Sequence, residues 1–150
     1  MSKGFPENND FSKRDLDNKK ITFVVSKFNE DIVSRLLNTT KERLLELGIN
    51  KKNINILYVP GAFEIPFAVK KSIDKYSQNA VICLGTIIRG ETSHYELISN
   101  HVFSSLANLN ISQKIPIING ILTTENINQA EKRIENGKYY AETCLEMINL

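Results

Sequence analysis

The stretch AVICLGTII at Ala80–Ile88 decides the fold, because it is the most apolar part of the sequence and carries no charge. A run that is apolar at successive positions, without alternation, predicts a strand that is buried on both faces. Strands of this kind are typical of the middle of a parallel sheet that lies between two layers of helices. We therefore expect Ala80–Ile88 to be a central strand.

The sequence around this strand alternates between short apolar runs and segments with helical spacing. The short runs predict three more strands, at Ile21–Ser26, Ile54–Val59 and residues 115–122. Helices are expected over residues 30–47, 66–76, 94–109 and 127–134, and from about residue 137 to residue 148. Four strands, each followed by a helix, predict a four-stranded parallel sheet with helices on both faces, which is an α/β fold in three layers.

Single residues refine this prediction at the helices. Gly48 is expected to end the first helix, because glycine is the usual residue just beyond a helix C-terminus. Thr123 or Thr124 is expected to cap the helix that follows the fourth strand. Phe67 and Leu97 fall on helix faces that we expect to be buried.

The composition is that of one globular domain, with 150 residues, 41% hydrophobic residues and a net charge of +2. This charge is too small to favour nucleic-acid binding, and no apolar run approaches the ~20 residues of a membrane span. We divide the chain into a polar N-terminal arm (residues 1–19) and a domain (residues 20–150). The arm lacks the apolar segment of a secretory signal, so we expect a cytoplasmic protein. Cys83 and Cys144 have no metal-type spacing, and we expect no metal site.

The segment RGETSH at residues 89–94 is the strongest local chemical signal. Gly90 permits a tight turn, and the following backbone N–H groups would open a helix whose N-terminus can bind an anion such as phosphate. The helix dipole disfavours a charged His94, so a neutral imidazole could carry protons at about pH 7. Residue types alone favour a simpler interpretation, with Thr92 or Ser93 as a helix cap and His94 as a solvated side chain.

Three other positions are open to two interpretations from the sequence. Phe28, at a strand end, can stack on a heterocycle or be an ordinary exposed loop residue. Glu64 can accept hydrogen bonds from a polyol or stabilise a helix start as an acid in the first turn. Arg133 can bind a phosphate as a bidentate donor or be a solvated charge. His101 is interpreted as a structural or surface histidine, since no carboxylate or cysteine completes a metal set around it.

Four segments together resemble the lumazine synthase family: VSKFN at residues 25–29, VPGAFEIP at 59–66, LGTIIRGETSHY at 84–95 and NGILTTENINQ at 119–129. The resemblance covers about residues 20–150. It implies a flavodoxin-like αβα sandwich that forms homopentamers, with decamers or hollow shells of twelve pentamers in some relatives. It also implies sites between neighbouring subunits, an N-terminal arm that adds a strand to the adjacent subunit's sheet, and riboflavin synthase as a further partner.

The resemblance implies one catalytic residue and two groups of substrate-binding residues. His94 is the implied proton-transfer residue. The pyrimidine ring and its ribityl chain are bound by Phe28, Ala62, Phe63, Glu64, Thr86, Ile87 and Ile88. The phosphate is bound by Glu91, Thr92 and Arg133, and Asn119 approaches the ring from the neighbouring subunit.

The implied reaction condenses 5-amino-6-(D-ribitylamino)uracil with 3,4-dihydroxy-2-butanone 4-phosphate, the penultimate step of riboflavin biosynthesis. The amine of one substrate forms a Schiff base with the ketone of the other, phosphate leaves, and the ring closes with loss of water. No cofactor is therefore expected. Two alternatives are a non-catalytic flavin-binding protein on the same scaffold and a flavodoxin-like electron carrier. The second is disfavoured, because the loop after the first strand does not resemble a phosphate cradle.

The sequence departs from the family pattern near its C-terminus. Relatives usually carry a longer loop with glycine and lysine before the last helix. The corresponding segment here, residues 133–138, is shorter, and Lys138 follows the glycine. A role for Lys138 in place of the family's lysine is left open. Glu91 also places an acid beside the implied phosphate, so we expect its side chain to point away.

Overall fold

The computed structural model describes residues 15–150, and within them the chain forms one parallel sheet of four strands. The strands are β1 (Ile21–Ser26), β2 (Ile54–Val59), β3 (Ala80–Ile88) and β4 (Ile117–Thr124). Their spatial order is β2-β1-β3-β4, and all neighbours pair in parallel. β1 and β3 are thus the central strands, and the order reverses its direction between them, as in flavodoxin-like sheets.

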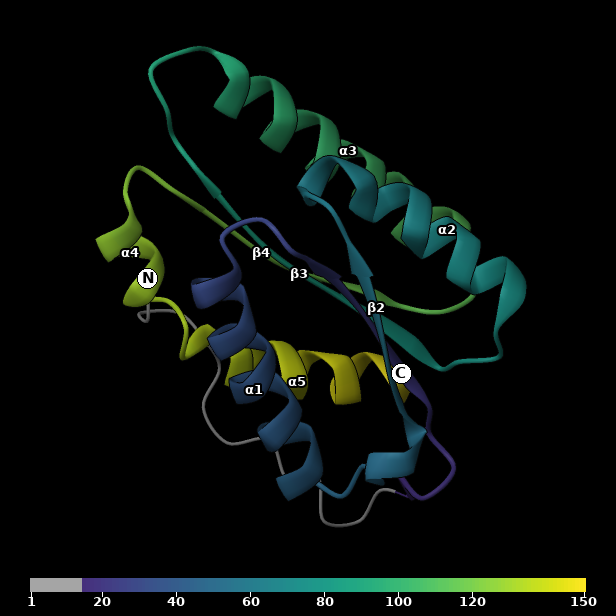
Figure 1. Ribbon diagram of the computed structural model, residues 1–150. Helices are drawn as coiled ribbons and strands as arrows, with labels where there is room; N and C mark the ends of the chain where they lie inside the picture. The colour runs from purple at the N-terminus through teal and green to yellow at the C-terminus, as the bar shows by residue number, and fades with distance from the viewer. Residues whose placement is uncertain (1–14) are drawn as a thin grey trace.

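Helices cover both faces of the sheet (Figure 1). One layer contains α1 (Glu30–Glu46), α4 (Ile127–Glu131) and α5 (Asn136–Ile148), and the other contains α2 (Ile65–Lys75) and α3 (His94–Ser112). Two short 3-10 helices, η1 (Lys51–Asn53) and η2 (Ala62–Glu64), precede β2 and α2. The predicted three-layer α/β fold is confirmed. No helix in residues 15–150 is long and apolar enough to cross a membrane.

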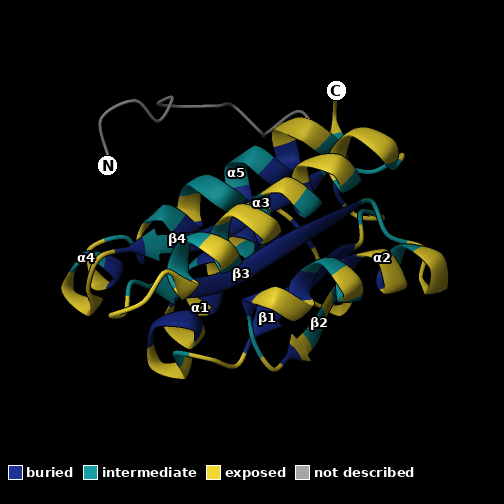
Figure 2. Cartoon of the chain, turned by 90° about the horizontal axis from the view of Figure 1, so that it is seen from above, coloured by how far each residue is buried: buried dark blue, intermediate teal, exposed yellow. Residues whose placement is uncertain are grey.

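Two apolar clusters, one on each face of the sheet, hold the helices in place. Within β3, Ile82 and Leu84 pack in the cluster of α1 and α5, whereas Val81 and Cys83 pack in the cluster of α2 and α3. Figure 2 shows β3 buried along most of its length, which explains why its sequence lacks alternation. Cys144 lies in the α1–α5 cluster, so the two cysteines of the chain are buried in opposite layers.

The residues just before β1 pack against the domain. Leu16 is buried in the α1–α5 cluster. The carbonyl oxygen of Asp17 accepts a hydrogen bond from Asn53 Nδ2 over 2.8 Å. Residues 15–19 of the predicted arm therefore contact the domain of their own chain. Residues 1–14 lie outside the described part, so the role expected of the arm on a neighbouring subunit stays a prediction.

The predicted bounds of β1, β2 and β3 agree with the structure, and those around β4 are wrong. β4 begins at Ile117 and includes Thr123 and Thr124, which pair with the end of β3. Neither threonine caps the next helix; the side chain of Asn126 does so, accepting a hydrogen bond from Gln129 N over 3.0 Å. The error has a physical cause, because a β-branched threonine also fits a strand.

The α2–α3 layer leaves large apolar side chains exposed. The prediction that Phe67 and Leu97 are buried is wrong, since 73% and 66% of their surfaces are exposed. On α2 the buried positions include Val69, and on α3 they are Val102 and Leu106, so the sheet-facing side of each helix excludes the two mispredicted residues. The α2–α3 layer therefore exposes apolar side chains that the helical spacing alone would place in the core.

A close contact joins α5 to α1 through Gly137. A Cβ atom at Gly137 would lie 2.6 Å from Thr40 Oγ1 and 3.1 Å from the carbonyl oxygen of Leu36. Thr40 is buried, and its hydroxyl donates to that same carbonyl over 2.8 Å. Arg43 joins the helices further along, with Nη2 2.8 Å from Glu142 Oε1. The short connection before α5 thus ends in a tight helix–helix contact.

Candidate active site

A cavity of about 640 Å³ lies beyond the carboxyl ends of the central strands. The loops after β1, β2 and β3 form its walls, together with the first turns of α3. The strand order reverses between β1 and β3, and ligands of open α/β sheets bind beside such a reversal. The position of the cavity in the fold therefore makes it the candidate site.

Most of the predicted site residues line this cavity, although they come from three separate segments of the chain. The cavity-lining residues of the predicted set are Phe28, Ala62, Phe63, Glu64, Thr86, Ile87, Ile88, Thr92 and His94. The segments that follow β1, β2 and β3 thus meet at one cavity. Residues 119–124, which begin the fourth motif segment, belong to β4 instead. The roles of the lining residues toward substrate remain predictions.

Three predicted residues lie outside the cavity of their own protomer. Glu91 is exposed in the loop before α3. Asn119 lies in β4 and lines a separate groove at the edge of the sheet. Arg133 follows α4, which ends at Glu131 and not at residue 134 as predicted, and its guanidinium donates to Gln129 O over 2.8 Å. A second copy of the chain would have to bring Asn119 to a cavity.

Asn29 belongs to the cavity but is absent from the predicted set. Its backbone is left-handed, with φ 59° and ψ 48°, a conformation that asparagine tolerates better than most residues. Its side chain does not cap α1; Nδ2 donates instead to Thr86 O over 2.9 Å. This bond ties the β1–α1 loop to the end of β3, beside the exposed ring of Phe28. From the sequence, an asparagine just before a helix would be interpreted as a cap.

The N-terminus of α3 opens at the cavity, which Thr92 and His94 line. The backbone N–H of His94 donates to Thr92 Oγ1 over 3.3 Å, whereas the side chain of Ser93 makes no cap. The first N–H groups of a helix have no acceptor within the helix, and they carry its partial positive charge. This helix start can therefore accept an anion.

Arg89 connects the start of α3 to the end of β4. Its guanidinium pairs with Glu96 in the first turn of α3, and its Nε lies 2.8 Å from Oε2 of Glu125. Its Cζ lies 4.3 Å from the centre of the Tyr95 ring. The hydrogen bond to Glu96, and then the one to Glu125, raises the pKa of Arg89, and the bond from Arg89 lowers the pKa of Glu96. Arg89 begins the RGETSH segment, but nothing in the sequence indicates its pairing with Glu96 and Glu125.

The cavity contains few polar side chains, but they are chemically varied. His94 supplies an imidazole and Glu64 a carboxylate, both exposed to solvent. The Thr86 hydroxyl is buried without a hydrogen-bond partner, so it is available to a ligand. Phe63 stacks on His101 with ring centroids 4.8 Å apart. Such a set can hold a polar aromatic ring and transfer a proton. Within residues 15–150 no group of three or more His, Cys, Asp and Glu could hold a metal.

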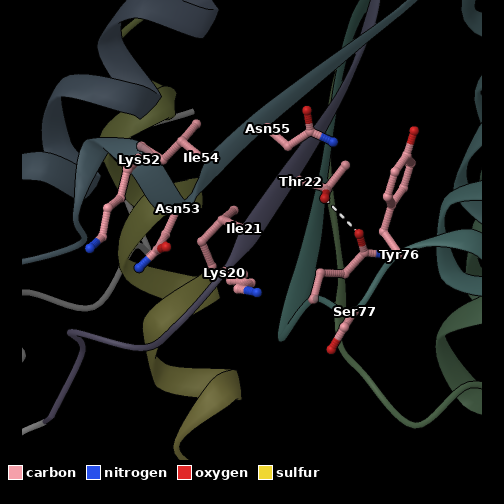
Figure 3. Close-up of a pocket in the computed structure, with 10 residues that line it drawn as sticks. Lys20, Ile21, Thr22, Lys52, Asn53, Ile54, Asn55, Tyr76 and Ser77 are labelled. Atoms are coloured by element: carbon pink, nitrogen blue, oxygen red, sulfur yellow. Dashed lines mark hydrogen bonds between the residues drawn. The ribbon is translucent and has the colours of Figure 1, made fainter.

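A smaller cavity of about 380 Å³ lies at the opposite edge of the sheet, where β1 and β2 begin (Figure 3). Lys20 and Lys52 line it, and Thr22 Oγ1 donates to Gln78 Oε1 over 2.6 Å. It contains none of the residues in the four motif segments. We therefore assign the functional site to the larger cavity.

The fold and the larger cavity define a flavodoxin-like α/β protein with a cavity at the carboxyl edge of its parallel sheet, the edge at which ligands of such folds bind. A family model described as 6,7-dimethyl-8-ribityllumazine synthase matches residues 18–150. The chain therefore belongs to the lumazine synthase family, whose function lies in riboflavin biosynthesis.

Proposed function

We propose that the protein is an active 6,7-dimethyl-8-ribityllumazine synthase, a transferase that condenses 5-amino-6-(D-ribitylamino)uracil with 3,4-dihydroxy-2-butanone 4-phosphate. The observation that carries the proposal is one cavity that combines the aromatic ring of Phe28, the carboxylate of Glu64 and the open N-terminus of α3. A heterocycle, a polyol and a phosphate are three of the chemical groups that the two substrates contain. Each has a suitable partner in the cavity.

The pyrimidine substrate would occupy the β1 and β2 side of the cavity. Its ring stacks on Phe28 and meets the backbone of Ile87 and Ile88. Its ribityl hydroxyls donate to Glu64 beside Ala62 and Phe63. The phosphate of the ketone would lie at the start of α3, against the backbone N–H groups near Thr92. The side chain of Glu91 would point away from it.

The chemistry then needs little from the protein beyond placement. The substrate amine attacks the ketone carbon, water leaves as the Schiff base forms, the phosphate group departs, and the second amine closes the ring with loss of another water. Holding both reactants together can contribute up to ~7–11 kcal/mol. His94, in the first turn of α3, would carry protons to and from the reacting groups, an effect of about 10²–10⁴-fold.

We further propose that the working unit is a homo-oligomer, most simply a pentamer, in which Asn119 and Arg133 complete the site of a neighbouring protomer. Two features support this. Both residues lie outside the cavity of their own chain, and the α2–α3 layer exposes large apolar side chains, including Phe67, Leu97 and Ile111. Apolar surfaces of this kind are typical of subunit interfaces. Light scattering on the purified protein tests the stoichiometry.

The decisive experiment mixes the purified protein with both substrates and follows the fluorescent lumazine and inorganic phosphate together. An active synthase releases one phosphate for each lumazine, at a rate well above the uncatalysed reaction. A protein that binds riboflavin tightly and leaves the rate at background would instead be a flavin-binding protein on this scaffold. A third outcome, neither turnover nor flavin binding, would contradict both functions.

A further inference from the structure

We propose that Arg89 is a positioning residue that sets the shape of the 90–93 loop for the phosphate of the ketone substrate. The inference rests on the proposed function, because it concerns the phosphate side of that site. Arg89 itself does not line the cavity. It would act through the backbone that follows it in the chain.

Arg89 is fixed on three sides at the base of the loop. Its backbone N–H donates to Thr124 O over 2.9 Å, which ties the end of β3 to the end of β4. Its guanidinium reaches Glu125 on one side and Glu96 on the other. The ring of Tyr95 lies beneath it, with its centre 4.3 Å from Cζ. One side chain thus clamps the segments before and after the loop.

The loop between these anchor points has little support of its own. Residues 90–94 are all exposed, and a Cβ at Gly90 would meet no atom within 4 Å. The hydrogen bond found inside this segment runs from His94 N to Thr92 Oγ1. Since packing does not hold the loop, its ends must determine where its N–H groups point. Arg89 directly precedes the loop, and its guanidinium pairs with Glu96 just after it.

Charge provides the second reason. Glu96 and Glu125 place two carboxylates at the base of a loop that must accept a phosphate, and like charges repel it. The guanidinium between them offsets part of this repulsion. Oε2 of Glu96 is buried and has no hydrogen-bond partner, and the other oxygen, Oε1, accepts from Arg89. Loss of Arg89 would leave a poorly compensated acid beside the phosphate site.

The test separates phosphate positioning from a general loss of stability. We would prepare Arg89→Met, Arg89→Lys and, as a matched control, Arg35→Met. Arg35 also bridges two acids, with Nη1 3.4 Å from Asp31 Oδ2 and 3.7 Å from Glu131 Oε1, but it does not line or adjoin the cavity. Steady-state kinetics would give kcat and a KM for each substrate, and calorimetry would give the Kd of inorganic phosphate.

For Arg89→Met we expect a rise of about tenfold or more in the KM of the phosphorylated ketone and in the Kd of phosphate. The KM of the pyrimidine should stay within about twofold. Arg89→Lys should recover part of the loss, because an ammonium keeps the charge but cannot span both acids with a planar fork. Arg35→Met should leave both KM values unchanged.

Several outcomes would overturn the proposal: unchanged ketone KM and phosphate Kd in Arg89→Met, an equal rise in both KM values, or the same rise in Arg35→Met. If Arg89→Met does not fold, Arg89→Lys decides, since a wild-type ketone KM in that variant contradicts the positioning role. A wild-type protein without turnover would refute the proposed function separately. The phosphate Kd of the variants would then still support or refute the role of Arg89.

Discussion

Replacing Gly137 by alanine should destabilise the protein, although alanine is the better helix former. The added Cβ would lie 2.6 Å from Thr40 Oγ1 and 3.1 Å from Leu36 O, and the second of these atoms belongs to the α1 backbone. Overpacking of this kind costs about 1–3 kcal/mol, whereas the exchange of glycine for alanine inside a helix gains roughly 0.5–1 kcal/mol. The net loss should therefore be about 1–2 kcal/mol.

Thermal unfolding at equal protomer concentrations measures this effect, because an oligomer's midpoint depends on concentration. A loss of this size lowers Tm by roughly 2–8 °C in a domain of this length. A second variant, Thr40→Ala, removes the closest atom at the cost of its hydrogen bond to Leu36. The double variant should be destabilised by about 1 kcal/mol less than the sum of the losses in the two single variants. Wild-type stability in Gly137→Ala, or strict additivity, would refute the packing argument.

Three further outcomes follow from the site. His94→Ala should slow lumazine formation by about 10²–10⁴-fold and leave a residual rate that comes from substrate placement. An undiminished kcat would remove His94 from the mechanism. If each site combines two chains, Phe28→Ala and Arg133→Met protomers that are each impaired alone should regain activity when they are unfolded and refolded together. Activity no higher than that of the separate variants would contradict a shared site. Because Arg89 lowers the pKa of Glu96, their pairing stabilises the fold above the ordinary carboxyl pKa of 4.5 and is lost as the pH falls through the lower folded value. The stability difference between wild type and Glu96→Gln should thus shrink on acidification, and a difference that grows instead would reverse the assigned sign.

The central elements could be predicted from sequence because their patterns had one interpretation. Ala80–Ile88 has too many successive apolar residues for any surface position, and the structure buries it between two layers. The predicted bounds of β4 are two residues early because Pro116 and Thr123 are ambiguous: a strand can begin after a proline, and a threonine can cap a helix or extend a strand. The prediction of a buried Phe67 is wrong for a different reason, since an apolar residue that stays exposed has the same helical spacing as one in a core.

The candidate site, like the fold, is only partly predictable from the sequence. The cavity-lining residues were found because four motif segments in the right order are specific, whereas each polar residue alone supported a structural interpretation at least as well. Asn29 and Arg89 are absent from the predicted site, because their roles depend on contacts between segments distant in the chain. The Asn29 side chain reaches the end of β3, and the Arg89 side chain reaches Glu125 after β4. These partners come together because β3 lies between β1 and β4 in the sheet.

The placement of the two cysteines provides a means to time the opening of each helical layer. Burial raises the pKa of both thiols, so neither Cys83 nor Cys144 should react with an alkylating reagent in the folded protein. Each sulfur becomes reactive only when its own layer separates from the sheet, and the sequence contains no third cysteine. Peptide masses after timed alkylation therefore distinguish exposure beneath α2 and α3 from exposure beneath α1 and α5, without any introduced label.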